Sequence, residues 1–111
     1  MLRFFLILAA VLLAACFGPA VTVPSGLVGP NATLPDTIAC DHPLIVHAAS
    51  ERSGINAEHS WIDAHYPGHT QYMQSLGGDG RRKFDILAFQ SREGRSISVC
   101  FDITSFFGSY D

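Results

Sequence analysis

The 111-residue sequence lacks an apolar run of the length that a membrane-spanning helix needs, about 20 residues. Its longest run, residues 4–17, has no polar side chain except Cys16 and ends at Gly18 and Pro19. An apolar run of this length behind one positive residue, Arg3, is typical of an export signal. A buried core helix is the alternative, but this run lacks a polar face, so we expect an exported protein.

The sequence also lacks the motifs by which hydrolases and zinc proteins are recognised. No serine lies in a G-x-S-x-G turn, and the histidines His65 and His69 are separated by the helix-breaking pair Pro67-Gly68. The net charge of −3, with one basic run at residues 81–83, argues against nucleic acid as a partner. These absences predict a protein that is not an enzyme and needs no cofactor.

Cysteine is scarce, and the three cysteines are an odd number that an exported protein must account for. Leu13-Ala14-Ala15-Cys16 resembles the lipobox of bacterial lipoproteins, with a leucine, two small residues and a cysteine at the end of the apolar run. The resemblance implies cleavage before Cys16 and attachment of lipid to its thiol and to the new amino terminus. Because Phe17 follows the cysteine where an aspartate would imply retention at the inner membrane, we expect the outer membrane, facing the periplasm.

Ordinary signal peptidase cleavage before Val21 is an alternative, because Gly18 and Ala20 are small residues at the required positions. Either cut removes Cys16 from the pairing problem. We expect Cys40 and Cys100 to form a disulfide, with two buried free thiols as the alternative. A closed loop of about 60 residues would stabilise the fold by about 4 kcal/mol.

The chain is expected to divide into three parts. Residues 1–15 are the signal peptide, residues 16–35 a lipidated tether rich in proline and glycine, and residues 36–111 one small domain. Loss of the signal peptide removes one arginine and leaves six basic and ten acidic residues, a net charge of −4.

Hydrophobic periodicity predicts an α+β domain in which one amphipathic helix packs on a three- to four-stranded antiparallel sheet. The helix is expected at residues 54–66, with Ser53 or Asn56 as its N-cap. Strands are expected at residues 70–76, 82–90 and 96–104, and residues 43–49 are expected to form either a first strand or an extended stretch that covers the core. The order of one helix followed by three strands resembles cystatin-type and PepSY-type periplasmic domains, without a motif that transfers a functional residue.

Two neighbouring stripes of the helix are expected to face the sheet, and the acids Glu58 and Asp63 to lie on its solvated side. The stripes are Ile55, His59, Ile62 and Tyr66, and beside them Ala57, Trp61 and Ala64.

The phrase Phe-Asp-Ile occurs in two predicted strands and places an acid, Asp85 or Asp102, among apolar neighbours. We expect both acids on the sheet face away from the helix, either as ordinary polar alternation or as a binding surface. Trp61 and Tyr72 are the aromatic candidates for lining a cleft. Cys100 alternates away from the apolar stripe of its strand, so Cys40 should lie over the opposite face or along the edge.

His59, Asp63 and His65 are weak candidates for metal ligands, because a histidine and a carboxylate on one helix face can hold zinc or copper. Scattered histidines are the alternative. We expect a membrane-anchored envelope lipoprotein that binds a protein partner or serves as a structural accessory module. The alternative is a cystatin-like inhibitor or a periplasmic domain that binds a small ligand.

Overall fold

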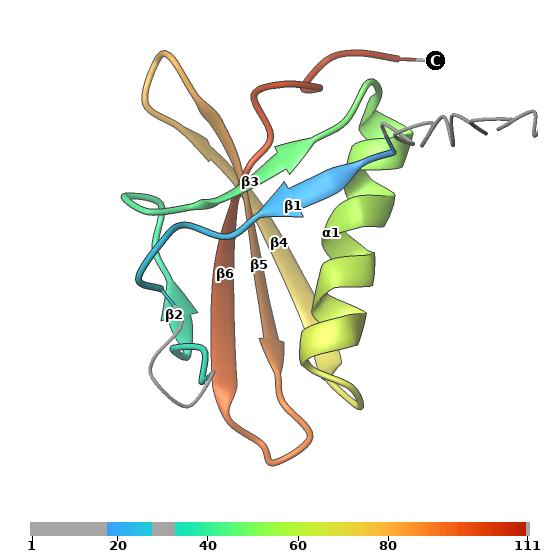
Figure 1. Ribbon diagram of the computed structural model, residues 1–111. Helices are drawn as coiled ribbons and strands as arrows, with labels where there is room; N and C mark the ends of the chain where they lie inside the picture. Colours follow the sequence, from blue (N-terminus) through green and yellow to red (C-terminus); the bar gives the residue numbers. More distant parts are fainter. Residues whose placement is uncertain (1–17, 28–32, 111) are drawn as a thin grey trace, which may run out of the picture.

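The computed structural model describes residues 18–27 and 33–110, so the expected signal peptide and Cys16 lie outside the described residues. Helix α1 (Glu51–His65) packs on one face of a six-stranded sheet (Figure 1). This arrangement confirms the α+β class. The strands are β1 (Ala20–Thr22), β2 (Thr37–Ile38), β3 (Leu44–His47), β4 (Thr70–Gly78), β5 (Lys83–Gln90) and β6 (Ser96–Asp102).

The sheet has the order β1-β3-β6-β5-β4, and β2 pairs beside β3 on the same strand, β6. Strands β4, β5 and β6 form the predicted antiparallel meander. Both β2 and β3 run parallel to β6, so the expectation of three or four purely antiparallel strands is wrong. The two- and three-residue strands are too short to show the alternation by which strands are recognised in a sequence.

Part of the expected tether belongs to the domain, because β1 pairs antiparallel with β3. Val21 lies opposite Val46 in this ladder, and both Val21 and Val23 pack against the core. The prediction that the ordered domain begins near residue 36 is therefore wrong. Prolines at both ends of this short stretch concealed a strand at the edge of the sheet, where proline is tolerated.

Helix α1 begins at Glu51, three residues before the start at residue 54 that the periodicity predicts. Ser50 is the N-cap and forms a capping box with Ser53, which was expected to be the cap itself. Beyond the helix, Pro67 prevents another turn and Gly68 adopts the left-handed conformation, with φ of 81°.

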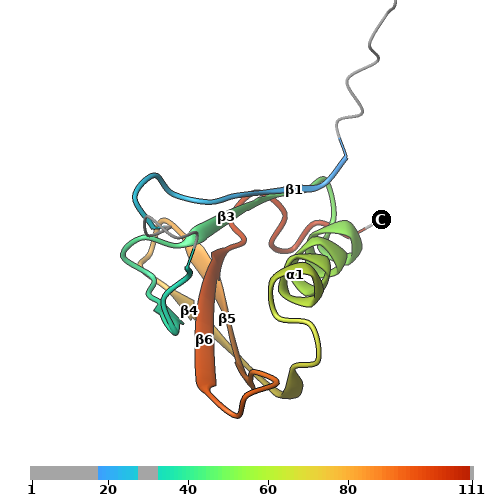
Figure 2. The same ribbon diagram turned by 60° about the horizontal axis from the view of Figure 1, so that its bottom comes forward.

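The buried face of α1 is rotated from the expected one. The residues it buries are Gly54, Glu58, Trp61 and Ile62, whereas Ile55 is exposed. Figure 2 shows the helix on one side of the meander. The rotation brings an acid, Glu58, into the helix–sheet interface.

The C-terminal tail returns to the helix, where Gly108 N–H donates a hydrogen bond to Glu51. Phe106 is buried, and its ring lies so close to Gly54 that a β-carbon there would stand 2.4 Å from Phe106 Cζ. Only glycine leaves room for this contact. Among the described helices, none is long and apolar enough to cross a membrane.

The disulfide between Cys40 and Cys100 is present, with a Cα–Cα distance of 5.2 Å, and confirms the predicted pairing. Cys40 follows β2, which lies beside β6, so the bridge fastens the edge of the sheet. The edge of the sheet is one of the two positions that the alternation in β6 predicts for Cys40.

Candidate functional site

Five of the candidates from the sequence lie in or beside a cluster of rings at the C-terminal end of α1. We call Trp61, Tyr66, His69, Tyr72 and Phe89 the aromatic cluster. Phe89 is its centre, with ring centroids 5.1 Å from Tyr66, 5.4 Å from His69 and 6.0 Å from Tyr72. Edge-to-face contacts of this kind stabilise beyond the area they bury.

The two aromatic residues expected to line a cleft have different environments. Trp61 is 8% exposed and packs edge-on against Phe101 of β6, so most of its ring belongs to the core. Its remaining surface borders a recess beside Ala57 and Ser60. Tyr72 is 41% exposed and remains accessible on the edge strand β4.

The three metal candidates have separate partners. His65 stacks on Trp61 and its Nδ1 donates a hydrogen bond of 2.7 Å to the carbonyl oxygen of Trp61. His59 packs against Tyr72, and Asp63 lies 3.5 Å from Nε2 of His69. Over residues 18–27 and 33–110, no group of three or more histidine, cysteine or acidic residues is placed to hold a metal ion.

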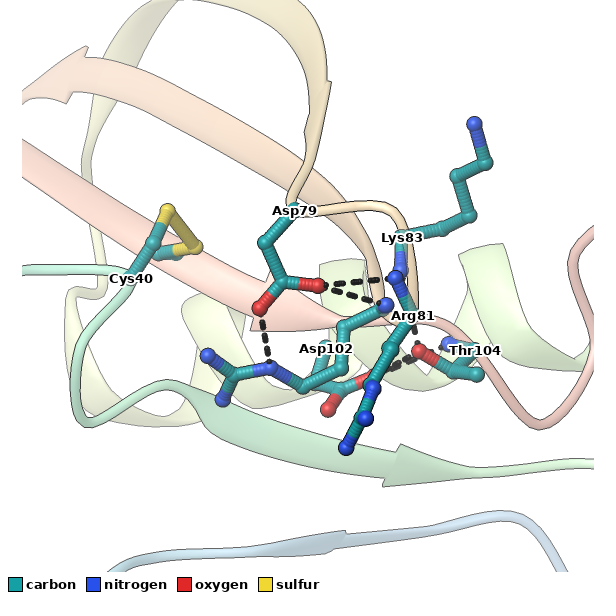
Figure 3. A network of polar contacts seen from close by, with 8 residues as sticks. Cys40, Asp79, Arg81, Lys83, Asp102 and Thr104 are labelled. Carbon is teal, nitrogen blue, oxygen red and sulfur yellow. Dashed lines mark hydrogen bonds and ion pairs between the residues drawn. A yellow bond between two sulfur atoms is a disulfide. The ribbon is translucent and has the colours of Figure 1, made fainter.

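Asp102 lies at the end of β6 and organises the backbone there (Figure 3). Its Oδ1 accepts hydrogen bonds from the backbone N–H and the hydroxyl of Thr104, at 2.9 and 2.6 Å. The Thr104 hydroxyl in turn accepts the backbone N–H of Lys83. The Asp102 carboxylate therefore has a structural role, because it stabilises the turn that follows β6.

The neighbouring basic run, residues 81–83, lies at the turn between β4 and β5. Asp79 accepts the backbone N–H groups of Arg81 and Arg82 and the Nε of Arg82 (Figure 3). The backbone and side-chain hydrogen bonds from Arg82 lower the pKa of Asp79 to about 2.

Asp85 does not lie on the same face as Asp102, so the expectation for this pair is wrong. In the β5–β6 ladder Asp85 is opposite Phe101, on the helix side, whereas Asp102 is opposite Phe84, on the other side. An offset of one residue in an antiparallel register exchanges the two faces. The repeated Phe-Asp-Ile phrase does not reveal this offset.

Asp85 meets Glu58 of α1 in the helix–sheet interface. The two residues are only 3% and 1% exposed, so the expectation that Glu58 faces solvent is also wrong. From the edge strand β4, Gln74 donates hydrogen bonds from Nε2 to both carboxylate oxygens of Asp85, at 2.8 and 2.9 Å. Three elements thus bring an amide and two acids together.

Burial raises the pKa of Glu58 to about 9, and the hydrogen bond to Asp85 and the charge of Asp85 act in the same direction. Glu58 is therefore a neutral carboxylic acid at neutral pH, beside the carboxylate of Asp85. Its Oε1 atom is buried and has no hydrogen-bond partner. A buried acceptor without a partner is uncommon and costs free energy.

These acids border a recess of about 150 Å³, which we call the acid pocket. It lies between the N-terminal half of α1, the meander and the C-terminal tail, where no arginine or lysine contributes to its wall. Its lining residues are Glu51, Ile55, Glu58, Gln74, Leu76, Asp85, Ile103, Phe106 and Phe107.

This pocket was not predicted from the sequence, although its helical wall has a recognisable spacing. Glu51, Ile55 and Glu58 lie at positions i, i+4 and i+7 and therefore share one helix face. Aligning that stripe with the acid in the middle of β5 would have suggested an acid pair. The contribution of the tail could not be read from spacing.

The fold and pocket thus define an α+β domain with one helix on a mixed sheet and a small acidic recess between them. Comparison with protein-family models, with curated proteins and with solved structures found no match to this chain.

Proposed function

We propose that this chain is a lipid-anchored lipoprotein of the bacterial cell envelope that acts by binding or as a structural accessory module, not as an enzyme. The observation that carries the proposal is the disulfide between Cys40 and Cys100. Disulfides form and persist in oxidising compartments such as the periplasm. The bridge uses two of the three cysteines and leaves Cys16, in its lipobox-like setting, as the residue available for lipid.

The position of β1 favours a cut before Cys16 over a cut before Val21. A cut before Val21 would remove Ala20, which pairs with His47 in β1. A cut before Cys16 keeps the whole strand. Only three residues then lie between Cys16 and Ala20, and four Cα–Cα steps span at most about 14 Å, so the domain would lie near the membrane surface.

Lipid attachment would hold the protein at the membrane through several acyl chains, and two or more chains make anchoring stable. The expected location is the outer membrane, with the domain in the periplasm. The absence of an aspartate after Cys16 supports this assignment.

The acid pocket supports a role in binding, because a buried acid pair beside a recess costs stability that packing alone would not require. This observation also favours the second candidate, a periplasmic domain for a small ligand. The order of α1, β4, β5 and β6 resembles that of cystatin-type and PepSY-type domains, and this resemblance is the support for an inhibitor role.

Mass spectrometry of the full chain purified from bacterial membranes tests the predicted cleavage site and the lipid attachment. We expect an N-terminal peptide that begins at Cys16 and carries lipid, and loss of membrane association in the variant Cys16→Ala. The double variant Cys40→Ala/Cys100→Ala is the matched control and should stay lipidated. An unmodified chain beginning at Val21 would overturn the lipoprotein assignment.

Affinity purification of the anchored protein from envelope membranes tests the accessory role. We expect one envelope protein to be enriched relative to a purification without tagged protein. If nothing is enriched above background, the accessory-module role is wrong, whatever the state of the N-terminus.

A further inference from the structure

We propose that the acid pocket binds a small organic cation, an alkylguanidinium or alkylammonium group with a short apolar tail. The inference deepens the proposed binding role and is independent of the lipid anchor. It is carried by the charge of the pocket, by an unpartnered oxygen and by the nature of the walls.

The charge of the pocket selects a cation. Its three titratable lining residues are the acids Glu51, Glu58 and Asp85, and no lining residue is basic. Glu51 is partly engaged, because its Oε1 accepts the backbone N–H of Gly108. Asp85 has hydrogen bonds to Gln74 and to Glu58, and neither partner carries a positive charge, so Asp85 lacks a buried counter-ion among the described residues.

The unpartnered oxygen selects a hydrogen-bond donor. Glu58 is 99% removed from solvent and its Oε1 has no partner, although Glu58 borders the recess. A ligand with several N–H groups can donate to Glu58 and Asp85 at once. A guanidinium group presents five N–H donors in a planar fork, which suits two adjacent carboxyl groups.

The apolar walls of the pocket favour a ligand with a small apolar tail attached to its charged group. Ile103 and Phe106 are buried at the base, whereas Ile55, Leu76 and Phe107 are exposed around the opening. A cavity of 150 Å³ is large enough for a group the size of benzene. A guanidinium or ammonium group with two or three methylenes is of this size.

The same chemistry has two sources, a free small amine or guanidine and an arginine or lysine side chain of a partner protein. The test therefore uses two probes, propylguanidinium chloride and the blocked peptide acetyl-Gly-Arg-Gly-amide. Binding is followed by chemical shift changes in NMR spectra of the full chain in detergent micelles, with the disulfide formed and folding checked by the amide spectrum.

We expect saturable shifts confined to residues of the acid pocket, with weaker binding of guanidinium itself, which lacks the tail. Neutral propylurea has a similar shape and should bind at least about tenfold more weakly, because it lacks the charge. Tighter binding of propylguanidinium assigns a free ligand, and tighter binding of the peptide assigns a partner side chain.

Two pocket variants separate charge from shape. Asp85→Asn removes the charge and should weaken propylguanidinium binding at least about tenfold. Glu58→Gln imitates the neutral acid and should keep the affinity at pH 7 within about threefold, because an amide also donates to Asp85 and accepts from a ligand. The control Asp41→Asn changes an exposed acid away from the pocket and should bind as the unaltered protein does.

Leu76→Ala provides a test that does not depend on the buried acids, because Leu76 is exposed and its truncation leaves the core intact. It should reduce the preference for propylguanidinium over guanidinium. The proposal is wrong if Asp85→Asn binds as tightly as the unaltered protein, if propylurea competes equally, or if neither cationic probe binds. Such a result would leave the outcomes of the lipidation and purification experiments unaffected, so the two proposals fail separately.

Discussion

The two ends of the helix–sheet interface differ in the side chains that they bury. At the C-terminal end of α1, the aromatic cluster fills the space with rings that contact one another around Phe89. At the N-terminal end, drawn at the top of Figure 1, the acid pocket leaves a recess and buries two acids. Packing at the first end raises the free energy of unfolding, whereas the buried acids at the second end lower it. A local loss of stability of this kind is typical of a binding site.

The largest expected effect is at the aromatic end. Phe89→Ala should lower the free energy of unfolding by about 3–5 kcal/mol, because it removes the ring on which three others pack. Urea unfolding followed by Trp61 fluorescence measures the loss. Met73→Ala, at an exposed position of β4, is the control and should change stability by less than about 0.5 kcal/mol. Equal losses in the two variants would contradict the role of Phe89.

At the acid pocket, replacing a buried acid by a neutral side chain should raise the free energy of unfolding, whereas Phe89→Ala lowers it. The pKa of Glu58 is raised to about 9 in the folded state from 4.5, so its contribution to stability is complete below pH 4.5 and is lost as the pH rises through about 9. Glu58→Gln removes this loss and should raise the free energy of unfolding at pH 8 by an amount on the order of 2 kcal/mol.

Unfolding of both proteins between pH 5 and pH 9 checks this prediction. The difference between Glu58→Gln and the unaltered protein should grow with pH, and the exposed variant Asp41→Asn should show no such trend. A difference that stays constant across this range would mean that Glu58 is ionised in the folded protein.

A smaller effect is expected where the helix meets the tail. Gly54→Ala places a methyl group 2.4 Å from the Phe106 ring, and overpacking of this kind costs about 1–3 kcal/mol, partly offset by about 1 kcal/mol of helix propensity. A double-mutant cycle with Phe106→Leu should recover most of the loss. If the two substitutions are additive, the tail does not pack on Gly54.

The smallest effect is expected at the exposed acid beside the aromatic cluster. Asp63→Asn breaks a pair with His69 on the surface and should change stability by less than about 0.5 kcal/mol. Thermal unfolding with and without zinc distinguishes a simple contact between Asp63 and His69 from a metal site. Stabilisation of the unaltered protein by zinc, lost in Asp63→Asn, would instead support the metal hypothesis for His59, Asp63 and His65.

The sequence predicts the strands of the meander closely because each is long enough to alternate. The predicted strands at residues 82–90 and 96–104 correspond to β5 and β6 with shifts of one or two residues at their ends. The disulfide is predicted for a different reason, since two cysteines in an exported domain are expected to pair.

The candidate site is predicted less well. Asp85 is singled out in the sequence, but its partner Glu58 is assigned to solvent because acids are rarely buried. Trp61 is expected to line a cleft; it packs in the core and also borders a recess beside Ala57 and Ser60. The error at Glu58 follows from the orientation of α1, which the helical period alone does not determine.

The sequence by itself determined the helix, the meander, the cysteine pairing and the resemblance of residues 13–16 to a lipobox, because these depend on local period, composition and spacing. Only the tertiary structure decided that β1 joins the sheet, that β3 runs parallel to β6 and that Glu58 faces Asp85. These features depend on contacts between residues far apart in the chain. Their energy comes from strand pairing and burial that no single segment contains.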